Sequence, residues 1–93
     1  MSENEARTLI TLCLATDAYE FHDHFVQRLD ERGLFFSDVL LIADHPTAVR
    51  LDGEDEFLRQ RVLLRGGTSG GEVELLVCLE PEPFCEFITI YWM

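Results

Sequence analysis

Residues 72–92 read EVELLVCLE, PEP and FCEFITIYW, two runs of nine residues joined by a prolyl link. Aliphatic, β-branched and aromatic side chains dominate both runs, which is typical of β-strands. Pro81 and Pro83 separate the runs, because proline donates no backbone hydrogen bond and favours a turn. The segment therefore predicts two antiparallel strands, over 72–80 and 84–92.

Both predicted strands are apolar on their two faces. Successive side chains of a strand point to opposite sides, and both sides carry apolar residues: Val73, Leu75, Leu76, Val77, Cys78, Leu79, Phe87, Ile88, Ile90, Tyr91 and Trp92. One face is expected to pack on helices. The other face needs a cover too, either the N-terminal strand described next or a second copy of the chain, in a homodimer through the C-terminal strands.

The N-terminal part predicts a strand and a first helix. Residues 7–15 (RTLITLCLA) alternate apolar residues with others, which indicates a strand. A helix is expected over 18–32, because Asp17 with Glu20 three residues later resembles a capping box. Gly33 then supplies the left-handed residue that commonly ends a helix.

A second, shorter helix is expected over 38–44. Ser37 is its predicted N-cap, and Pro46 ends it because the residue before a proline is pushed out of helical dihedral angles. After Pro46, apolar residues recur at every second position, and this spacing predicts strands with turns between them. These segments are a short strand over 47–51, a strand over 56–65 and a flexible hairpin loop over 66–71.

Together these elements predict an α+β fold in a single domain over residues 1–93. An N-terminal strand and two helices would pack on a C-terminal antiparallel sheet of three to four strands. A chain of 93 residues that is 47% hydrophobic has material for one core. No apolar run approaches the roughly 20 residues of a membrane-spanning helix. The acidic start MSENE is unlike a secretory signal, so a cytoplasmic location without membrane contact is expected.

The charge of the chain favours a basic partner. Eighteen acidic residues stand against seven basic ones, for a formal net charge of −11. A field of this sign repels nucleic acid and anionic membranes at long range. All seven basic residues are arginines, and six of them fall in the middle of the chain: Arg28, Arg32, Arg50, Arg59, Arg61 and Arg65.

One histidine and two arginines form a candidate catalytic row. His24, Arg28 and Arg32 are spaced by four residues, which places them in an oblique row at the edge of the apolar helix stripe. Histidine can act as acid or base near neutral pH, and arginine can hold phosphoryl oxygens. The alternative is structural: His24 would contact Glu20 or Asp23, and the arginines would pair with Glu31, Asp38 or the sheet edge.

Three strand arginines are candidate substrate-binding residues. Arg59, Arg61 and Arg65 share one side of the predicted strand 56–65. If that side faces the helices, these arginines complete a site with the helix row. If Leu58, Val62 and Leu64 face the core instead, the arginines point away from the helix.

The same segments carry a resemblance to a family. The residues concerned are His24, Arg28, Leu29, Arg32, Gly33, Ser37, Asp38, Val39, Pro46 and Ile88-Thr89-Ile90-Tyr91-Trp92. From Tyr19 onward, this pattern resembles a group of small bacterial domains of unknown function placed near the BrnT and RelE toxins. The resemblance implies a compact BrnT/RelE-like α+β fold, descent from ribonuclease toxins that bind or cleave RNA, and an antitoxin as partner. Those toxins are usually basic, so a non-catalytic acidic module that docks on a basic partner stays open beside it.

The remaining polar and sulfur-containing residues predict no further chemistry. Cys13, Cys78 and Cys85 are expected to be reduced core thiols, with a disulfide between Cys78 and Cys85 as the alternative. His22 falls in the apolar stripe and is expected to be a core histidine. His22 and His24 lie about 200° apart on a helix, so they cannot bind one ion together. Neither a metal nor a cofactor is predicted.

Overall fold

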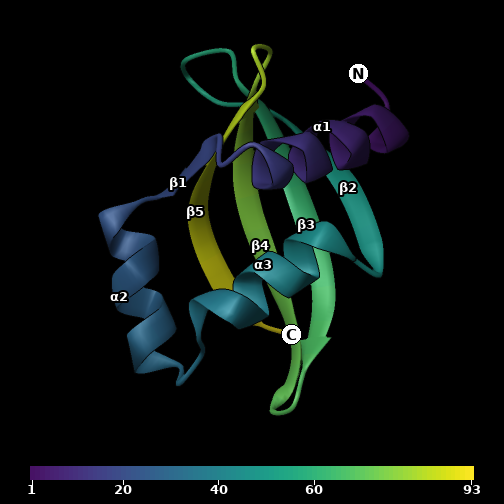
Figure 1. Ribbon diagram of the computed structural model, residues 1–93. Helices are drawn as coiled ribbons and strands as arrows, with labels where there is room; N and C mark the ends of the chain where they lie inside the picture. The colour runs from purple at the N-terminus through teal and green to yellow at the C-terminus, as the bar shows by residue number, and fades with distance from the viewer.

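The computed structural model describes residues 1–93, which form three helices and five strands (Figure 1). In chain order the elements are α1 (Glu3–Ala15), β1 (Tyr19–Phe21), α2 (Asp23–Glu31), α3 (Phe36–Asp44), β2 (Ala48–Glu54), β3 (Gln60–Thr68), β4 (Gly71–Glu80) and β5 (Phe84–Trp92). The strands make one sheet in the order β1-β5-β4-β3-β2. The β1–β5 pair is parallel and the other pairs are antiparallel. The α+β class is therefore confirmed, with a mixed sheet of five strands rather than an antiparallel sheet of three or four.

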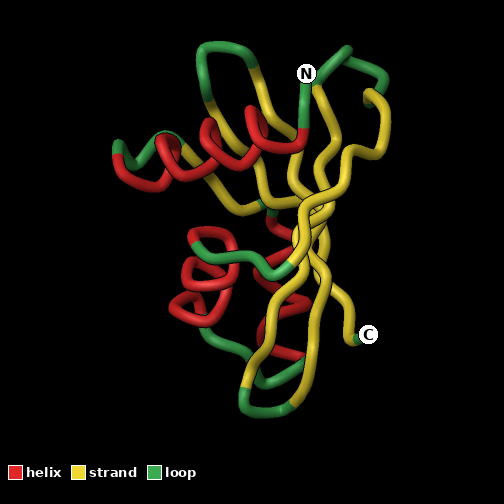
Figure 2. Tube along the Cα trace, turned by 90° about the vertical axis from the view of Figure 1, so that its right-hand side faces the viewer, coloured by secondary structure: helices red, strands yellow, loops and turns green.

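All three helices lie on one face of the sheet, and no helix covers the other face (Figure 2). We call these the helical face and the open face. The core lies between the helices and the helical face, and its largest fully buried side chains include Phe25, Phe87, Ile10, Leu64 and Leu75. Strand β4 is central, and its residues from Val73 to Leu79 are buried on both faces.

The predicted N-terminal strand over 7–15 is wrong, because this segment belongs to α1. Ser2 accepts a hydrogen bond from the Glu5 backbone and donates its own backbone N–H to the Glu5 carboxylate, a capping box that begins the helix. Ala6, Ile10 and Cys13 then fall on one buried face at helical spacing. Leu12, which alternation had placed with Ile10, is 45% exposed.

The predicted helix over 18–32 is interrupted by β1, and Asp17 does not cap it. Asp17 adopts a left-handed φ of 56° as α1 ends, and the Ala18 N–H donates to the Cys13 carbonyl at 2.8 Å. This is the Schellman arrangement that ends many helices. Tyr19–Phe21 then pair with Cys85–Phe87, and the helix begins only after His22.

The ends of α2 and α3 follow the sequence prediction more closely. Gly33 has a φ of 66° after the last turn of α2, so its predicted role is confirmed. The helix α3 ends at Asp44 before Pro46, as expected. Its N-cap is Phe35 rather than Ser37, because the Asp38 carboxylate accepts the Phe35 N–H at 2.9 Å.

The C-terminal strand pair is confirmed, since β4 and β5 nearly coincide with the predicted segments. The glycine-rich stretch is not a long loop, because Gly66 and Gly67 pair with β4 and only Ser69 and Gly70 form the turn. Gly66 also lets α3 approach the sheet. A Cβ atom there would lie 2.7 Å from Cγ2 of Ile42.

This close approach predicts that Gly66→Ala destabilises the protein by about 1–3 kcal/mol, the usual cost of overpacking a core. Chemical denaturation measures the change. Gly67→Ala is the matched control, because a Cβ atom there meets nothing within 4 Å. Equal stability of the two variants would mean that α3 does not pack tightly on β3.

Candidate functional site

The helix row His24, Arg28 and Arg32 does not converge on one point. The Arg28 Nε–H donates to His24 Nε2 at 3.1 Å, an arrangement that requires a neutral imidazole with Nε2 as acceptor. Arg28 Nη1 also lies 3.5 Å from Glu31, and both side chains are partly exposed. The expected contact of His24 with Glu20 or Asp23 is absent, whereas the Arg28–Glu31 pair is confirmed.

Arg32 lies apart from this pair, as the C-cap of α2. It lines a pocket of about 330 Å³ between the α2–α3 connection and the tip of the β3–β4 hairpin. Phe35, Ser69 and Trp92 are among the other lining residues. No carboxylate lies within ion-pair distance of Arg32.

The strand arginines lie on the open face, so the sheet separates them from α2. Val62 and Leu64 face the core. Arg61 and Arg65 occupy the alternate positions of β3 and therefore face the other way. Each of these arginines pairs with carboxylates on the open face: Arg59 with Asp55 (2.7 Å) and Glu86 (3.1 Å), Arg61 with Asp52 (2.9 Å), and Arg65 with Glu74 (3.0 Å). The helix and strand arginines therefore do not form one site.

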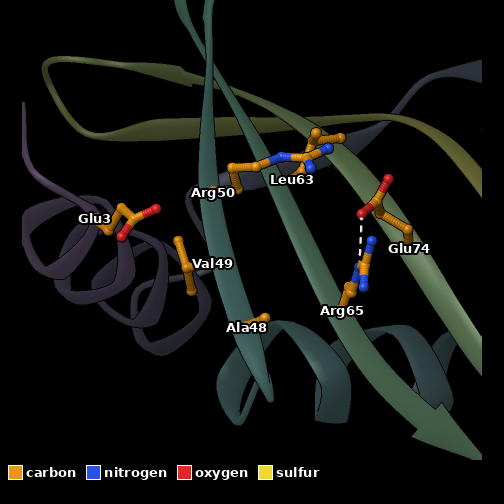
Figure 3. Close-up of a pocket in the computed structure, with 7 residues that line it drawn as sticks. All are labelled: Glu3, Ala48, Val49, Arg50, Leu63, Arg65 and Glu74. Atoms are coloured by element: carbon orange, nitrogen blue, oxygen red, sulfur yellow. Dashed lines mark hydrogen bonds and ion pairs between the residues drawn. The ribbon is translucent and has the colours of Figure 1, made fainter.

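A shallow hollow of about 290 Å³ lies beside edge strand β2 (Figure 3). Arg50 extends toward Leu63, its cross-strand neighbour, and Arg65 donates to Glu74. Arg50 is the one open-face arginine without a carboxylate partner. The hollow therefore offers a single free cation, which is little for holding a polyanion.

The most extensively hydrogen-bonded polar cluster lies in the loop between β2 and β3. Asp55 Oδ1 accepts the backbone N–H groups of Phe57 (2.9 Å) and Arg59 (2.8 Å), while Oδ2 accepts the Arg59 Nε–H (2.7 Å). Arg59 in turn reaches Glu86 on β5. The side chains of Asp55, Arg59 and Glu86 are each less than a fifth exposed. The loop is thus fixed at its base by a charged cluster on the open face.

This cluster changes the ionisation of Asp55. Desolvation alone would raise the pKa of its carboxyl, but the hydrogen bonds from Arg59 and Phe57 outweigh it and hold the pKa below its usual value. Hydrogen bonds to Asp55 and Glu86 raise the pKa of Arg59, against a large opposing effect of desolvation. Asp55 and Arg59 are therefore charged throughout the physiological range.

The tip of this loop presents two exposed apolar side chains, which we call the Phe57–Leu58 tip. Phe57 is 71% exposed and Leu58 is 76% exposed. Leu58 also has a φ of 62°, a left-handed backbone conformation that residues other than glycine, asparagine and aspartate rarely adopt. Sequence periodicity had placed Leu58 in the core with Val62 and Leu64, which is wrong.

The cysteines offer no nucleophile and no disulfide. All three are free and buried. Burial raises the pKa of both the Cys78 and the Cys85 thiol, so both stay protonated at neutral pH. Cys78 lies on the open face and Cys85 in the core, so the alternative disulfide between them is absent.

The histidines outside the row have local roles. His22 is exposed rather than in the core, and its Nδ1 accepts the His24 backbone N–H at 3.2 Å as the N-cap of α2. His45 pairs with the neighbouring Asp44. No group of three histidine, cysteine, aspartate or glutamate side chains is placed to hold a metal ion. None of the helices has the length and apolar character needed to cross a membrane.

Comparisons of the chain with family models, curated proteins and solved structures find no match. Function is therefore inferred from the side chains and their surroundings. The β2–β3 loop was not predicted as a site, but it carries a local signal: an aspartate side chain often accepts the backbone N–H two residues later in a turn, as Asp55 does from Phe57.

The ionisation of Asp55 predicts a pH-dependent stability. Because its folded-state pKa is lowered, the carboxylate stabilises the fold above the unfolded pKa of about 4, and this contribution is lost as pH falls through the lower folded value. Asp55→Asn should therefore be less stable than the parent at neutral pH, with a gap that narrows below about pH 4. Urea midpoints across this range measure the gap. Asp30→Asn, at an exposed position without a side-chain hydrogen bond, is the control, and an equally pH-dependent gap there would contradict the prediction.

The left-handed φ of Leu58 predicts a stabilising substitution. Asparagine tolerates this conformation better than leucine, so Leu58→Asn should raise the free energy of unfolding by up to about 1 kcal/mol. Denaturation midpoints measure the gain. Phe57→Asn, at similar exposure but without a positive φ, should show none. A loss of stability in Leu58→Asn would show that the leucine side chain packs on the fold.

Proposed function

We infer that the protein is a non-catalytic acidic interaction module that docks on a basic protein partner. The observation that carries this proposal is the distribution of charge. Four of the seven arginines pair with carboxylates of the same chain, at Arg28, Arg59, Arg61 and Arg65. These pairs use five of the eighteen carboxylates, so thirteen have no arginine partner.

Such a surface favours cationic partners for physical reasons. The unpaired carboxylates give the protein a negative potential that attracts a basic protein and speeds its association. The same potential repels the phosphates of RNA, and the four paired arginines are engaged by carboxylates and are not free to hold a phosphate. Binding through this potential weakens with salt, because salt screens charges that are more than about 8–10 Å apart.

A second candidate is binding or cleavage of RNA, which the resemblance to the BrnT/RelE-like domains implies. One contact favours it: the His24 imidazole lies directly beside the Arg28 guanidinium. His24 would accept the 2′-hydroxyl proton, and Arg28 would hold a phosphoryl oxygen. However, no other arginine contacts this pair, and Glu31 already competes for Arg28. The acidic module is therefore the better supported proposal.

Growth and RNA assays separate the two candidates. Expressed in a bacterial host, the chain should leave growth unchanged, and the purified protein should leave total RNA intact. His24→Ala should behave like the parent in both assays. Growth arrest that His24→Ala relieves, while Gln27→Ala on the same exposed helix turn does not, would favour the RNA candidate instead.

A binding assay tests the interaction module directly. Complexes formed in the host are cross-linked, and the captured proteins are identified and purified separately. At least one should have a high isoelectric point and bind the purified chain with a Kd that rises steeply between about 50 and 300 mM NaCl. Failure of every purified candidate to bind would overturn the proposal.

A further inference from the structure

We propose that the Phe57–Leu58 tip is the docking element of this protein, and that it inserts into an apolar pocket rimmed by lysine or arginine on the basic partner. This inference rests on the proposed interaction function and names the surface that performs it. Four features of the β2–β3 loop support it: exposure, hydrogen bonds at its base, backbone strain and nearby charge.

The exposure of the tip is large for two adjacent apolar residues. Phe57 and Leu58 together leave about three quarters of their surface in water, and Leu58 is the most exposed large hydrophobic residue of the chain. Burial of side chains of this kind in a partner is the typical energetic centre of an interface. The tip contributes nothing comparable to its own fold, since Phe57 makes one ring contact, to the Arg59 guanidinium at 5.7 Å.

The loop is nevertheless held in place by hydrogen bonds at its base. Asp55 accepts three hydrogen bonds from the loop, and its backbone N–H and carbonyl bond to Arg59 and Leu58 at 2.9 and 3.0 Å. Arg59 joins this turn to Glu86 on β5, which lies beyond β4 in the sheet. A loop already fixed in one conformation loses little entropy on binding, so more of the contact energy becomes affinity.

The backbone strain at Leu58 indicates that its side chain contributes to contact with a binding partner and not to the stability of the fold. A glycine or asparagine would adopt the φ of 62° at lower cost. The leucine side chain gains no burial in exchange, because it points into water. Strain kept at an exposed position is typical of functional sites.

The charge around the tip specifies the partner. Glu54 and Glu56 precede the tip in sequence, are exposed, and have no arginine partner. The nearest cations, Arg59 and Arg61, already pair with Asp55, Glu86 and Asp52. An apolar pocket with a lysine- or arginine-rich rim therefore matches the tip, whereas a second copy of this acidic chain would add repulsion.

Another exposed apolar group lies between α2 and α3 and serves as comparison. Val26, Phe35 and Phe36 are exposed there and line one hollow, but no residue of this group has a strained backbone. Phe35 is 72% exposed, nearly the same as Phe57, and both are phenylalanines. Phe35 is thus a matched control for a contact made by Phe57.

Site-specific photo-crosslinking tests the contact. The photoreactive amino acid p-benzoylphenylalanine replaces Phe57 in one full-length chain and Phe35 in another, and adducts formed in the host are identified by mass spectrometry. We expect a basic protein as the main adduct at position 57 and not at position 35. That protein, once purified, is the probe for the affinity measurements.

Titration calorimetry with this protein should show at least tenfold weaker binding for Phe57→Ser and for Leu58→Asn, and unchanged binding for Phe35→Ser. Leu58→Asn is the decisive variant, because it relieves strain and leaves a folded chain, so weaker binding cannot come from unfolding. A Glu54→Gln/Glu56→Gln double variant should flatten the salt dependence of Kd.

The outcomes separate this inference from the proposed function. If a basic protein binds but its adducts and affinity depend on position 35 and not on 57 or 58, the tip is the wrong surface and the interaction function stands. If no purified basic protein binds the chain at all, both fail together. Equal affinity of Leu58→Asn and the parent for the bound partner would overturn the docking role of the tip.

Discussion

The parallel pairing of Tyr19–Phe21 with Cys85–Phe87 determines where the other elements lie. These three residues separate α1 from α2, and Phe21 packs on Phe87 with ring centroids 5.0 Å apart. Both helices therefore stay on the same side of the sheet, and α3 packs there on β3 beside them. The open face receives no helix, so its arginines pair with carboxylates of strands and loops on the same face. This separation of the two faces decides the charge pattern from which function is inferred.

The strands were more predictable than the N-terminal half. The long apolar runs of β4 and β5 have a composition that suits only a buried sheet, and their limits follow from the prolines between them. The segment of α1 satisfies both periods at once, because Ile10, Leu12 and Leu14 alternate while Ala6, Ile10 and Cys13 follow the helix. The capping box at Ser2 and Glu5 distinguishes them. The strand β1 is too short for any periodicity and is defined only by its partner, 66 positions later in the register.

The candidate site was predictable only as a set of residues. Strand parity correctly grouped Arg59, Arg61 and Arg65 on one side, and Val62 with Leu64 on the other. Which side faces the helices depends on long-range packing, which local pattern does not contain. Leu58 departs from the pattern because the turn capped by Asp55 ends the strand period before Gln60. The pairing of each arginine likewise depends on cross-strand neighbours such as Glu74.

The single tryptophan of the chain, Trp92, packs on the β3–β4 turn, and this turn lies at the end of the molecule opposite the β2–β3 loop (Figure 1). The Trp92 ring packs against the turn so closely that a Cβ atom on Gly70 would lie 3.2 Å from the indole. Trp92 fluorescence is therefore an intrinsic signal of whether the last strand and this turn remain together. Because the indole is remote from the β2–β3 loop, its emission reports whether the sheet is intact, independently of any binding at that loop.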